Sequence, residues 1–359
     1  MDKHTRDFGM AVSAVKRIVL PEVTRVAVHI TYDCNQRCKT CDIWKINKDK
    51  PELRKTELNL EEFQEFCSKN PRILWMCLTG GEPYLKKEMK GFLDACLTIP
   101  SLRLISISTN GSVPEKIESD VRHLISSSRK DVTLATQVSL EGNEELHDTV
   151  SGSPGSYKRA VDTLGRLKKL ALIDSRVRWG LGYTLSYFNQ GGFLAMMDSL
   201  PKELVPPPGQ VQVSFGQKAD YYHWTEDRRV EPDKDVWKDE VRNFLRLTSW
   251  PDRLTDPYSM VEYLYYRKAI QLHNGQLPPK CVACQYTVTI DPYWEVHPCL
   301  FKFGLSLGNL KEKGYNLQEL VNSTKGRWAP IVDKCCKTTG CWTLCEDYMA
   351  IVARPWRAL

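Results

Sequence analysis

The chain has 359 residues, of which 42% are hydrophobic and 26% are charged, and its formal net charge is +6. This composition is typical of a globular protein that is large enough to bury a sizeable core. Lys and Arg are spread along the sequence and not gathered in one block, so we expect no nucleic-acid partner. A mildly positive surface would suit an acidic partner or an anionic substrate.

No stretch of about 18 uninterrupted apolar residues occurs, so we expect no contact with a membrane. The first 23 residues lack an apolar core followed by a small-residue cleavage site, which favours a cytoplasmic protein. Thirteen cysteines in such a chain indicate metal or redox chemistry and not a disulfide framework.

Strand-like runs alternate with helix-like runs through the first part of the chain. Runs rich in β-branched and apolar residues lie at 25–31, 72–79, 102–109, 131–140, 175–186 and 209–215. Helix-compatible runs lie between most of them, at 59–69, 86–97, 114–128 and 156–172. This alternation predicts βαβ units and a parallel sheet. Six units predict an α/β fold with a partial (β/α)6 TIM-like barrel, because a full barrel of eight units would need more chain.

The composition changes after the sixth strand. Two further helices are expected around 235–248 and 258–274, and seven cysteines follow between 281 and 345. We therefore predict an N-terminal extension at 1–23, a barrel at 24–235, linking helices at 236–274 and a small cysteine-rich domain with a β-hairpin at 275–359.

Three cysteines lie within the stretch CNQRCKTC, directly after the first predicted strand. They are Cys34, Cys38 and Cys41. In a parallel α/β barrel, the loops at the carboxyl ends of the strands build the active site. Three thiolates can bind three irons of a [4Fe–4S] cluster and leave the fourth iron open, as a catalytic site requires. The alternative is a zinc site that is completed by a distant ligand.

The second motif is TGGEP, from Thr79 to Pro83, at the end of the second predicted strand. Gly80 and Gly81 allow the backbone to approach a ligand closely, and Glu82 offers a carboxylate to an ammonium group. Alone, this stretch is also typical of a turn. Its position one βα unit after the cysteine loop makes it a specific signal.

With both motifs in register, the sequence resembles the radical S-adenosylmethionine (SAM) superfamily. The resemblance implies that Cys34, Cys38 and Cys41 are the catalytic cluster ligands and that SAM binds the fourth iron. It also implies a cofactor-binding role for a set of residues at the strand ends, for several of which a turn or helix cap is the alternative. The set is Thr40, Gly80, Gly81, Glu82, Asn110, Ser139 and Asn189.

The cysteine-rich tail resembles the auxiliary-cluster domains called SPASM and twitch. Cys281, Cys284 and Cys299 surround a predicted hairpin, but Val332 replaces one cysteine of the two-cluster pattern and none follows Cys345. The resemblance implies one complete auxiliary [4Fe–4S] cluster and leaves its ligands open, as it leaves open a second, incompletely ligated cluster. The two candidate sets are Cys281, Cys284, Cys299 and Cys345, or Cys281, Cys299, Cys341 and Cys345. A zinc ribbon is the other reading of these thiols.

The resemblance implies an enzyme that takes an electron from a flavodoxin or ferredoxin and cleaves SAM to a 5′-deoxyadenosyl radical. Our leading hypothesis is an oxidoreductase or mutase that abstracts a hydrogen from a small biosynthetic intermediate, with the auxiliary cluster in electron transfer. The runner-up is a peptide- or protein-modifying enzyme of the same superfamily, although about 24 residues before the first strand leave no room for a leader-binding domain. GTP-cyclising enzymes typically end in Gly-Gly, whereas this chain ends in RPWRAL. A non-catalytic metal scaffold is the third class.

Overall fold

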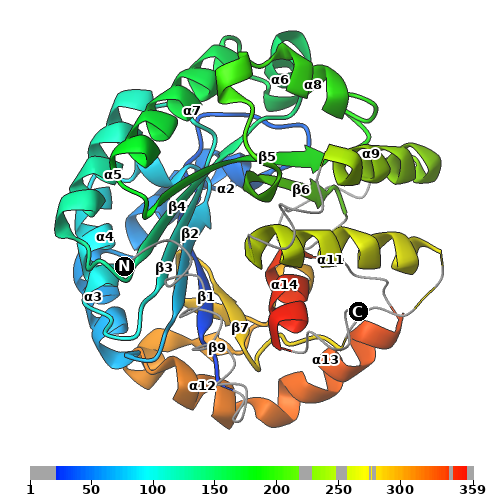
Figure 1. Cartoon of the computed structure of the whole chain (residues 1–359). Helices are drawn as coiled ribbons and strands as arrows, with labels where there is room; N and C mark the ends of the chain where they lie inside the picture. The colour runs from blue at the N-terminus through cyan, green and yellow to red at the C-terminus, as the bar shows by residue number, and fades with distance from the viewer. Residues whose placement is uncertain are drawn as a thin grey trace.

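The structure is a computed structural model, and it describes residues 22–217, 229–247, 257–274, 276, 280–338 and 343–353. A curved parallel sheet forms its centre, with helices along the convex face (Figure 1). The six barrel strands are β1 (Arg25–Thr31), β2 (Trp75–Gly80), β3 (Leu104–Thr109), β4 (Thr133–Ser139), β5 (Val177–Leu185) and β6 (Val211–Phe215). The covering helices are α3 (Leu60–Lys69), α4 (Met89–Leu97), α5 (Pro114–Ser127), α7 (Ser156–Ile173) and α8 (Phe193–Ser199). The predicted open α/β barrel is confirmed.

The two faces of the sheet differ in burial. On the convex face, Met76, Leu78 and Ile105 are fully buried against the helices. On the concave face, alternate residues of β2 to β6 are only half-buried, as the pattern of β3 shows. Alternation of this kind follows from the two-residue period of a strand, and it leaves an accessible hollow inside the barrel.

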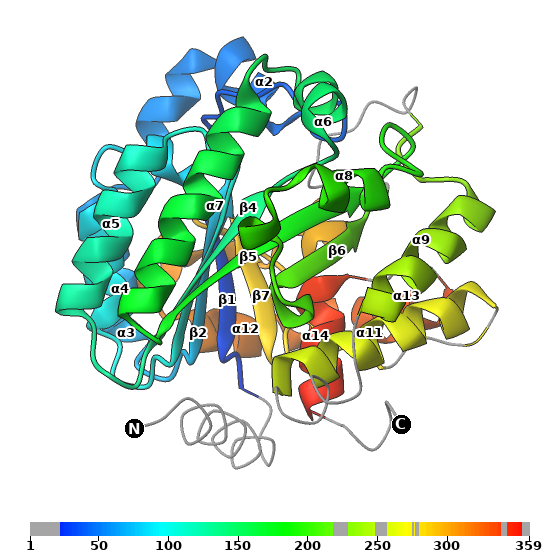
Figure 2. The same cartoon turned by 45° about the horizontal axis from the view of Figure 1, so that its top comes forward.

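Short helices cover the carboxyl ends of the strands. They are α2 (Ile43–Asp49), which follows the cysteine loop, and α6 (Glu144–Ser151), which follows β4. Figure 2 shows both at the same end of the barrel, where β1 and β4 also end. The sequence analysis named neither helix.

The cysteine-rich tail continues the barrel sheet. Its strands are β7 (Thr287–Ile290), β8 (Glu295–His297) and β9 (Gly308–Asn309). β7 and β8 form the predicted hairpin, and β7 also pairs in parallel with β1, where Val26 lies opposite Val288. The sheet order is β6-β5-β4-β3-β2-β1-β7-β8-β9. The predicted domain boundary at 275 is therefore crossed by a shared sheet, and the division into domains stays a prediction.

Trp294, in the turn between β7 and β8, packs into the barrel. Its side chain is fully buried, and its ring centroid lies 5.5 Å from that of Phe66 on α3. The indole Nε1–H donates to the Glu62 carboxylate at 2.8 Å. The hairpin thus shares a hydrophobic core with the first barrel helix.

Five more α-helices follow in the described residues: α9 (Lys234–Leu247), α11 (Pro257–His273), α12 (Leu317–Ser323), α13 (Lys325–Thr338) and α14 (Leu344–Ala353). In Figure 1, α11 and α14 lie between β6 and β7, on the open side of the sheet. The Tyr266 hydroxyl of α11 accepts the Val213 N–H at 2.6 Å and donates to the Val213 carbonyl at 3.0 Å. This hydroxyl satisfies the free backbone edge of β6, as a buried sheet edge requires.

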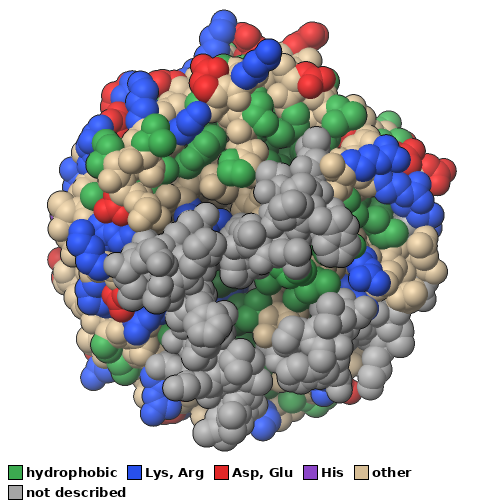
Figure 3. Space-filling model, in the orientation of Figure 1, with side chains coloured by type: hydrophobic (Ala, Val, Ile, Leu, Met, Phe, Trp, Pro, Cys, Tyr) green, Lys and Arg blue, Asp and Glu red, His purple; other side chains and the backbone are tan. Residues whose placement is uncertain are grey.

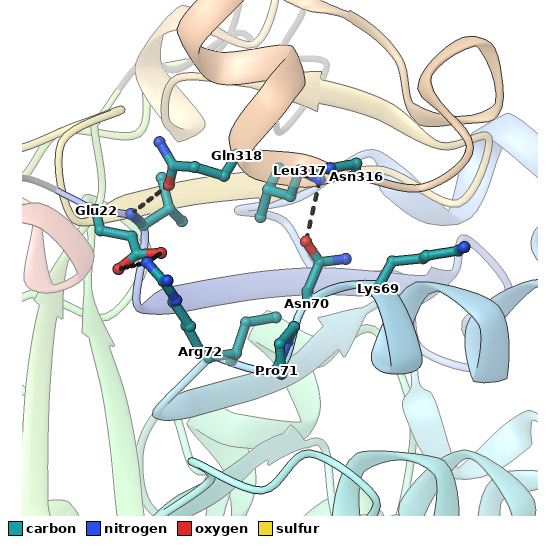
Figure 4. A pocket seen from close by; sticks show the side chains of 10 residues that line it. Glu22, Lys69, Asn70, Pro71, Arg72, Asn316, Leu317 and Gln318 are labelled. Carbon is teal, nitrogen blue, oxygen red and sulfur yellow. Dashed lines mark hydrogen bonds and ion pairs between the residues drawn. The ribbon is translucent and has the colours of Figure 1, made fainter.

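At the amino end of β2, a pocket of about 200 Å³ lies on the seam between the barrel and α12 (Figure 4). The Asn70 amide bridges this seam, because it donates to the Tyr315 carbonyl at 2.8 Å and accepts the Leu317 N–H at 3.0 Å. Gln318 accepts the Val23 N–H at 3.1 Å. Hydrogen bonds between the barrel and the tail thus pair Val23, Asn70 and Gln318 at this pocket, while Arg72 and Glu22 form an ion pair at 3.1 Å.

Within the described residues, no helix has the length and apolar character needed to cross a bilayer. The face drawn in Figure 3 carries Lys and Arg around its rim, interspersed with acidic side chains. On this face, the basic residues are dispersed, as the sequence suggests.

Candidate active site

The cysteine loop lies between β1 and α2 and is bound to α6 through backbone hydrogen bonds. The Arg37 N–H donates to the Ser151 carbonyl at 2.9 Å, and the Lys39 N–H donates to the Val150 carbonyl at 2.8 Å. Gly152 ends α6 with φ +60°, and a Cβ there would lie 2.7 Å from the Arg37 carbonyl oxygen. Glycine at this position therefore lets the loop approach the helix end.

Acidic side chains hold the base of the loop. The Tyr32 N–H donates to Glu57 at 2.7 Å, and Asn47 of α2 donates to both Glu57 at 2.8 Å and Asp33 at 3.0 Å. Arg54 donates to Asp33 at 2.8 Å. These bonds fix the direction in which the chain leaves β1, before the first cysteine.

The three thiols of the loop lie close to one another. Burial raises the pKa of Cys34 to about 11, with a smaller contribution from the Glu82 carboxylate. Burial also raises the pKa of Cys38, and the Cys41 and Cys34 thiols raise it further by repulsion. Since these groups interact electrostatically, they lie near one another. Thiolates in such a place need a positive charge beside them, which iron supplies, so the donor set fits an iron–sulfur cluster.

Among the residues the structure describes, no three His, Cys, Asp or Glu side chains converge on a point that a single metal ion would fill. A [4Fe–4S] cluster does not require such convergence, because each thiolate binds a different iron. The loop geometry is thus compatible with a cluster as the bound group.

Two side-chain amides contact the sulfurs of the loop. The Gln36 Oε1 lies 3.6 Å from the Cys38 Sγ, and the Asn110 Nδ2 lies 3.9 Å from the Cys34 Sγ. Gln36 is only 3% exposed, and its Nε2 is buried without a hydrogen-bond partner. The family resemblance predicts a cofactor-binding role for Asn110, whereas no sequence motif points to Gln36.

The two glycines of TGGEP lie against the backbone of the cysteine loop. The Gly81 N–H donates to the Thr31 carbonyl at 2.8 Å, and the Glu82 N–H donates to the Asp33 carbonyl at 2.7 Å. A Cβ at Gly80 would lie 2.3 Å from the Thr31 oxygen, and one at Gly81 would lie 2.2 Å from the Asp33 oxygen. The close approach that the glycines permit is therefore made by the loop that carries the cysteines.

Glu82 is fully buried and joins the ends of β2 and β3. Its carboxylate accepts hydrogen bonds from the Thr109 hydroxyl at 2.8 Å, the Asn110 N–H at 2.7 Å and the Tyr84 N–H at 3.1 Å. Burial raises its pKa to about 7, against the opposing effect of these donors. The side chain holds Asn110 beside Cys34, and its predicted contact with SAM stays a prediction.

The other predicted cofactor residues lie in different environments. Ser139 is half-buried on the concave face at the carboxyl end of β4, and Thr40 is half-buried in the cysteine loop. Asn189 is 2% exposed, and its amide bonds within the protein, to Ser186, Thr184 and Glu141. The structure therefore brings Thr40, Gly80, Gly81, Glu82 and Asn110 to the cysteine loop and places Asn189 in an internal network.

That network contains Glu141, whose carboxylate accepts the Thr184 N–H at 2.9 Å. Burial raises the pKa of Glu141 to about 8, and its charge in turn raises the pKa of Cys38. The Glu141 N–H donates to the His147 Nδ1 at 2.9 Å. No function is predicted for Glu141 from the sequence, although it follows the end of the fourth strand by two positions.

The concave face below the loop is polar and nearly uncharged. Gln137 extends over Gly182, where an added Cβ would lie 3.3 Å from its side chain. Thr184 and Ser214 share a hydrogen bond of 3.0 Å between their hydroxyls. The half-buried residues of this face on β2 to β6 are Trp75, Cys77, Thr79, Leu104, Ser106, Ser108, Ala135, Gln137, Ser139, Arg178, Gly182, Thr184, Gln212 and Ser214. Cys77 is half-buried on this face, because the alternation along β2 turns it toward the hollow.

The tail cysteines gather around the hairpin. Cys284 and Cys299 are buried, Cys281 is half-buried, and Cys335 of α13 lies near enough to Cys299 to raise its pKa. Burial raises the pKa of both Cys284 and Cys299, and the Glu346 carboxylate raises both further, a proximity that no sequence pattern indicates. Cys345 lies on α14, but the structure describes only its backbone, and Cys341 lies outside the described residues. The auxiliary ligand set stays a prediction.

Comparison with known families now identifies the barrel. Residues 28–197 match the family model of the Radical SAM superfamily. Residues 28–197 form a radical SAM domain. A radical SAM domain implies a [4Fe–4S] cluster and SAM, and the matched range includes Cys34, Cys38, Cys41 and the TGGEP motif.

Two curated relatives are GTP 3′,8-cyclases. This chain is 29% identical over 197 residues to the probable enzyme of Archaeoglobus fulgidus, across 52% of this chain and 62% of that protein. It is 35% identical over 86 residues to the enzyme of Psychromonas ingrahamii, across 23% of this chain and 24% of that protein. The matches thus span less than two thirds of either relative.

Solved structures share the fold at low identity. Native anSMEcpe with bound AdoMet has a TM-score of 0.59 at 12% identity, over 93% of this chain and 98% of that one. Streptococcus suis SuiB bound to S-adenosylmethionine has a TM-score of 0.57 at 13% identity, over 87% of this chain and 68% of that one. These similarities extend through the barrel and confirm its architecture.

Proposed function

We propose that this chain reductively cleaves SAM and uses the resulting radical to abstract a hydrogen from a small biosynthetic intermediate, in an oxidation, epimerisation or rearrangement. One observation carries the proposal. Three mutually close thiols lie on the loop after β1, inside the radical SAM domain, and two backbone hydrogen bonds from TGGEP bind that loop.

When bound, the cluster and SAM supply a 5′-deoxyadenosyl radical. The chain itself would position these groups. Cys34, Cys38 and Cys41 hold the iron, while Glu82 fixes Asn110 beside the loop through the Asn110 N–H. Thr40, Gly80, Gly81 and Ser139 border the same end of the barrel, where SAM would lie. Enclosure of the radical inside the hollow would exclude water and orient the substrate.

The nearly uncharged concave face supports a neutral, polar substrate. Hydroxyl and amide side chains there, such as Ser108, Gln137 and Gln212, can hydrogen-bond to hydroxyl or amide groups. A triphosphate would require several cations. Among the half-buried residues of this face on β2 to β6, Arg178 is the one cationic residue. Amide-rich surroundings also suit a peptide backbone, so a peptide-modifying enzyme remains our second candidate.

For the tail, we propose one auxiliary [4Fe–4S] cluster that transfers electrons. Cys281, Cys284, Cys299 and Cys345 form the ligand set that we favour, because the first three surround one hairpin and Cys345 lies on α14, beside Glu346. The proximity of Cys335 to Cys299 supports a test of Cys335 alongside them.

The test is anaerobic reconstitution followed by iron and sulfide analysis, with SAM and dithionite present. We expect about eight irons in the wild type and about four in the Cys34→Ala/Cys38→Ala/Cys41→Ala variant. Only the wild type should form 5′-deoxyadenosine. The Cys67→Ala/Cys96→Ala variant is the control, because these buried thiols interact with each other away from the loop. Stoichiometric zinc without SAM cleavage would overturn the proposal.

A further inference from the structure

We propose that a basic surface beside the cysteine loop, formed by Arg37, Trp44, Lys45, Lys48 and Lys50, is the docking site of a small acidic one-electron carrier protein. The inference rests on the proposed function, since that function requires an electron from outside. It adds where on the protein the electron enters and which charge the partner protein carries. We call these five residues the basic surface.

Three cations of the basic surface surround one indole ring. The Arg37 Cζ and the Lys48 Nζ each lie 5.3 Å from the ring centroid of Trp44, and the Lys45 Nζ lies 5.5 Å from it. Arg37 comes from the cysteine loop and the other two from α2, so the contacts join the two segments into one continuous patch. Arg37, Lys48 and Lys50 are exposed.

The local excess of positive charge is large for this chain. Residues 37–55 contain seven basic and three acidic side chains, although the net charge of the whole sequence is only +6. One of the acidic residues, Asp42, is buried and pairs with Lys45 at 2.9 Å, so the outer positive charge comes mainly from Arg37, Lys48 and Lys50. The three cations around Trp44 repel one another, and an acidic partner would relieve this repulsion.

The basic surface also lies close to the place where the electron is needed. Arg37 stands between Cys34 and Cys38 in the sequence, and Trp44 follows Cys41 by three positions. The loop backbone at Arg37 is fixed by its hydrogen bond to Ser151 at 2.9 Å. A protein docked on the Arg37 and Trp44 side chains would therefore contact the segment that holds the cluster.

The step itself moves one electron from the reduced carrier to the oxidised cluster, and it makes or breaks no covalent bond. Charge complementarity would act mainly on the encounter rate, and would weaken as salt screens the charges. A chemical reductant such as dithionite needs no docking surface. This difference allows the docking site to be tested separately from the enzyme activity.

The test compares Lys48→Glu/Lys50→Glu with Lys169→Glu/Lys202→Glu in the reconstituted protein. The control pair changes the net charge by the same amount. Lys169 is exposed in the last turn and a half of α7, and Lys202 is exposed in the connection between β5 and β6. Cluster reduction by reduced flavodoxin is followed by rapid-mixing absorbance, and binding of oxidised flavodoxin by titration at low and high salt. We expect the test pair to slow reduction about tenfold at low salt, with weaker binding, and the control pair to change little.

With dithionite, both pairs should be reduced as fast as the wild type, and Lys48→Arg/Lys50→Arg should retain the rate with flavodoxin. The docking site would be overturned if the two Lys→Glu pairs slowed reduction by flavodoxin equally. It would also be overturned if the rate of that reduction in the wild type did not depend on salt. Failure of both flavodoxin and ferredoxin to reduce a cluster that dithionite reduces would overturn it too. Failure of dithionite to yield any 5′-deoxyadenosine would instead contradict the proposed function.

Discussion

Gln36 is a buried side chain of the cysteine loop, and its hydrogen bond to Cys38 must change when Cys38 becomes a thiolate. With a protonated thiol, the Cys38 Sγ donates toward the Gln36 Oε1 at 3.6 Å, and the Gln36 Nε2 has no partner. A thiolate can only accept, so the amide would turn and present its N–H to sulfur. Hydrogen bonds to cluster sulfurs favour the more negative, reduced state.

We therefore predict that Gln36→Met lowers the reduction potential of the radical SAM cluster. Methionine fills similar space but cannot donate a hydrogen bond. At a fixed potential, the ratio of reduced to oxidised cluster should fall at least about threefold, with the iron content unchanged. Redox titration monitored by electron paramagnetic resonance measures this ratio. An unchanged midpoint would show that the amide does not donate to the sulfur.

His147 should make the protein sensitive to acid. Burial lowers its pKa to about 4 from the model-peptide value of 6.5. The folded state therefore binds fewer protons than the unfolded state between these values, so stability is full above about pH 6.5 and falls as the pH drops toward 4. The loss would reach at most about 3 kcal/mol.

His147→Asn is the matched variant for this effect, since an Asn oxygen can still accept the Glu141 N–H but does not titrate in this range. Urea unfolding at pH 7 and pH 5 should show a smaller pH dependence in the variant than in the wild type. An identical pH dependence in the two proteins would assign the acid sensitivity to other groups.

At the level of single residues, the sequence predicts the groups that act through spacing. Cys34, Cys38, Cys41 and the glycines of TGGEP follow from their fixed intervals after two strands. Gln36, Glu141 and Glu346 could not be found in this way, because their burial and neighbours depend on distant segments. Nothing in the sequence around Glu346 shows that it lies near both Cys284 and Cys299.

At the level of elements, the period of the apolar residues predicted the long helices and the strands well. The first strand is observed at Arg25–Thr31, as expected, and the helix expected at 114–128 is observed at Pro114–Ser127. The short helices α2 and α6 escaped prediction because two turns give too few apolar positions for a clear period. Yet these two helices hold the cysteine loop.

The contact between α6 and the cysteine loop gives an element-scale prediction. Gly152→Ala should both strain the left-handed backbone and push the Arg37 carbonyl away, because the added Cβ would lie 2.7 Å from that oxygen. Gly314→Ala is the control, since Gly314 has φ +51° but no atom within 4 Å of an added Cβ. Both variants should lose about 1 kcal/mol of stability from strain. Only Gly152→Ala should also bind less iron, which reconstitution measures directly, and equal iron in both would contradict this role of α6.

At the level of the whole molecule, the sequence predicted a barrel and a hairpin, but not that the two pair in one continuous sheet. β1 and β7 lie far apart in the chain, and no local pattern records which strands pair. The consequence is that the tail belongs to the barrel core, where Trp294 packs on Phe66 and bonds to Glu62.

We predict that Trp294→Ala destabilises the barrel by about 3 to 5 kcal/mol, because it empties a buried site shared with α3. Hydrogen exchange of α3 should accelerate strongly. Trp328→Ala is the control, because the Trp328 indole donates to Val321 within the tail itself. If the tail were an independent domain, neither variant would change exchange in α3, and that result would contradict the shared core.

The central place of β1 in the sheet also bears on how the protein is made. β1 is synthesised before the other strands of the sheet and is followed at once by the three thiols, but its second neighbour, β7, is synthesised only after the whole barrel. At about 5 to 20 residues per second, this delay is on the order of tens of seconds. During that time an unpaired strand edge and three oxidisable cysteines are exposed together in the nascent chain. Overproduction should therefore yield more intact protein when translation takes place without oxygen and with abundant chaperone.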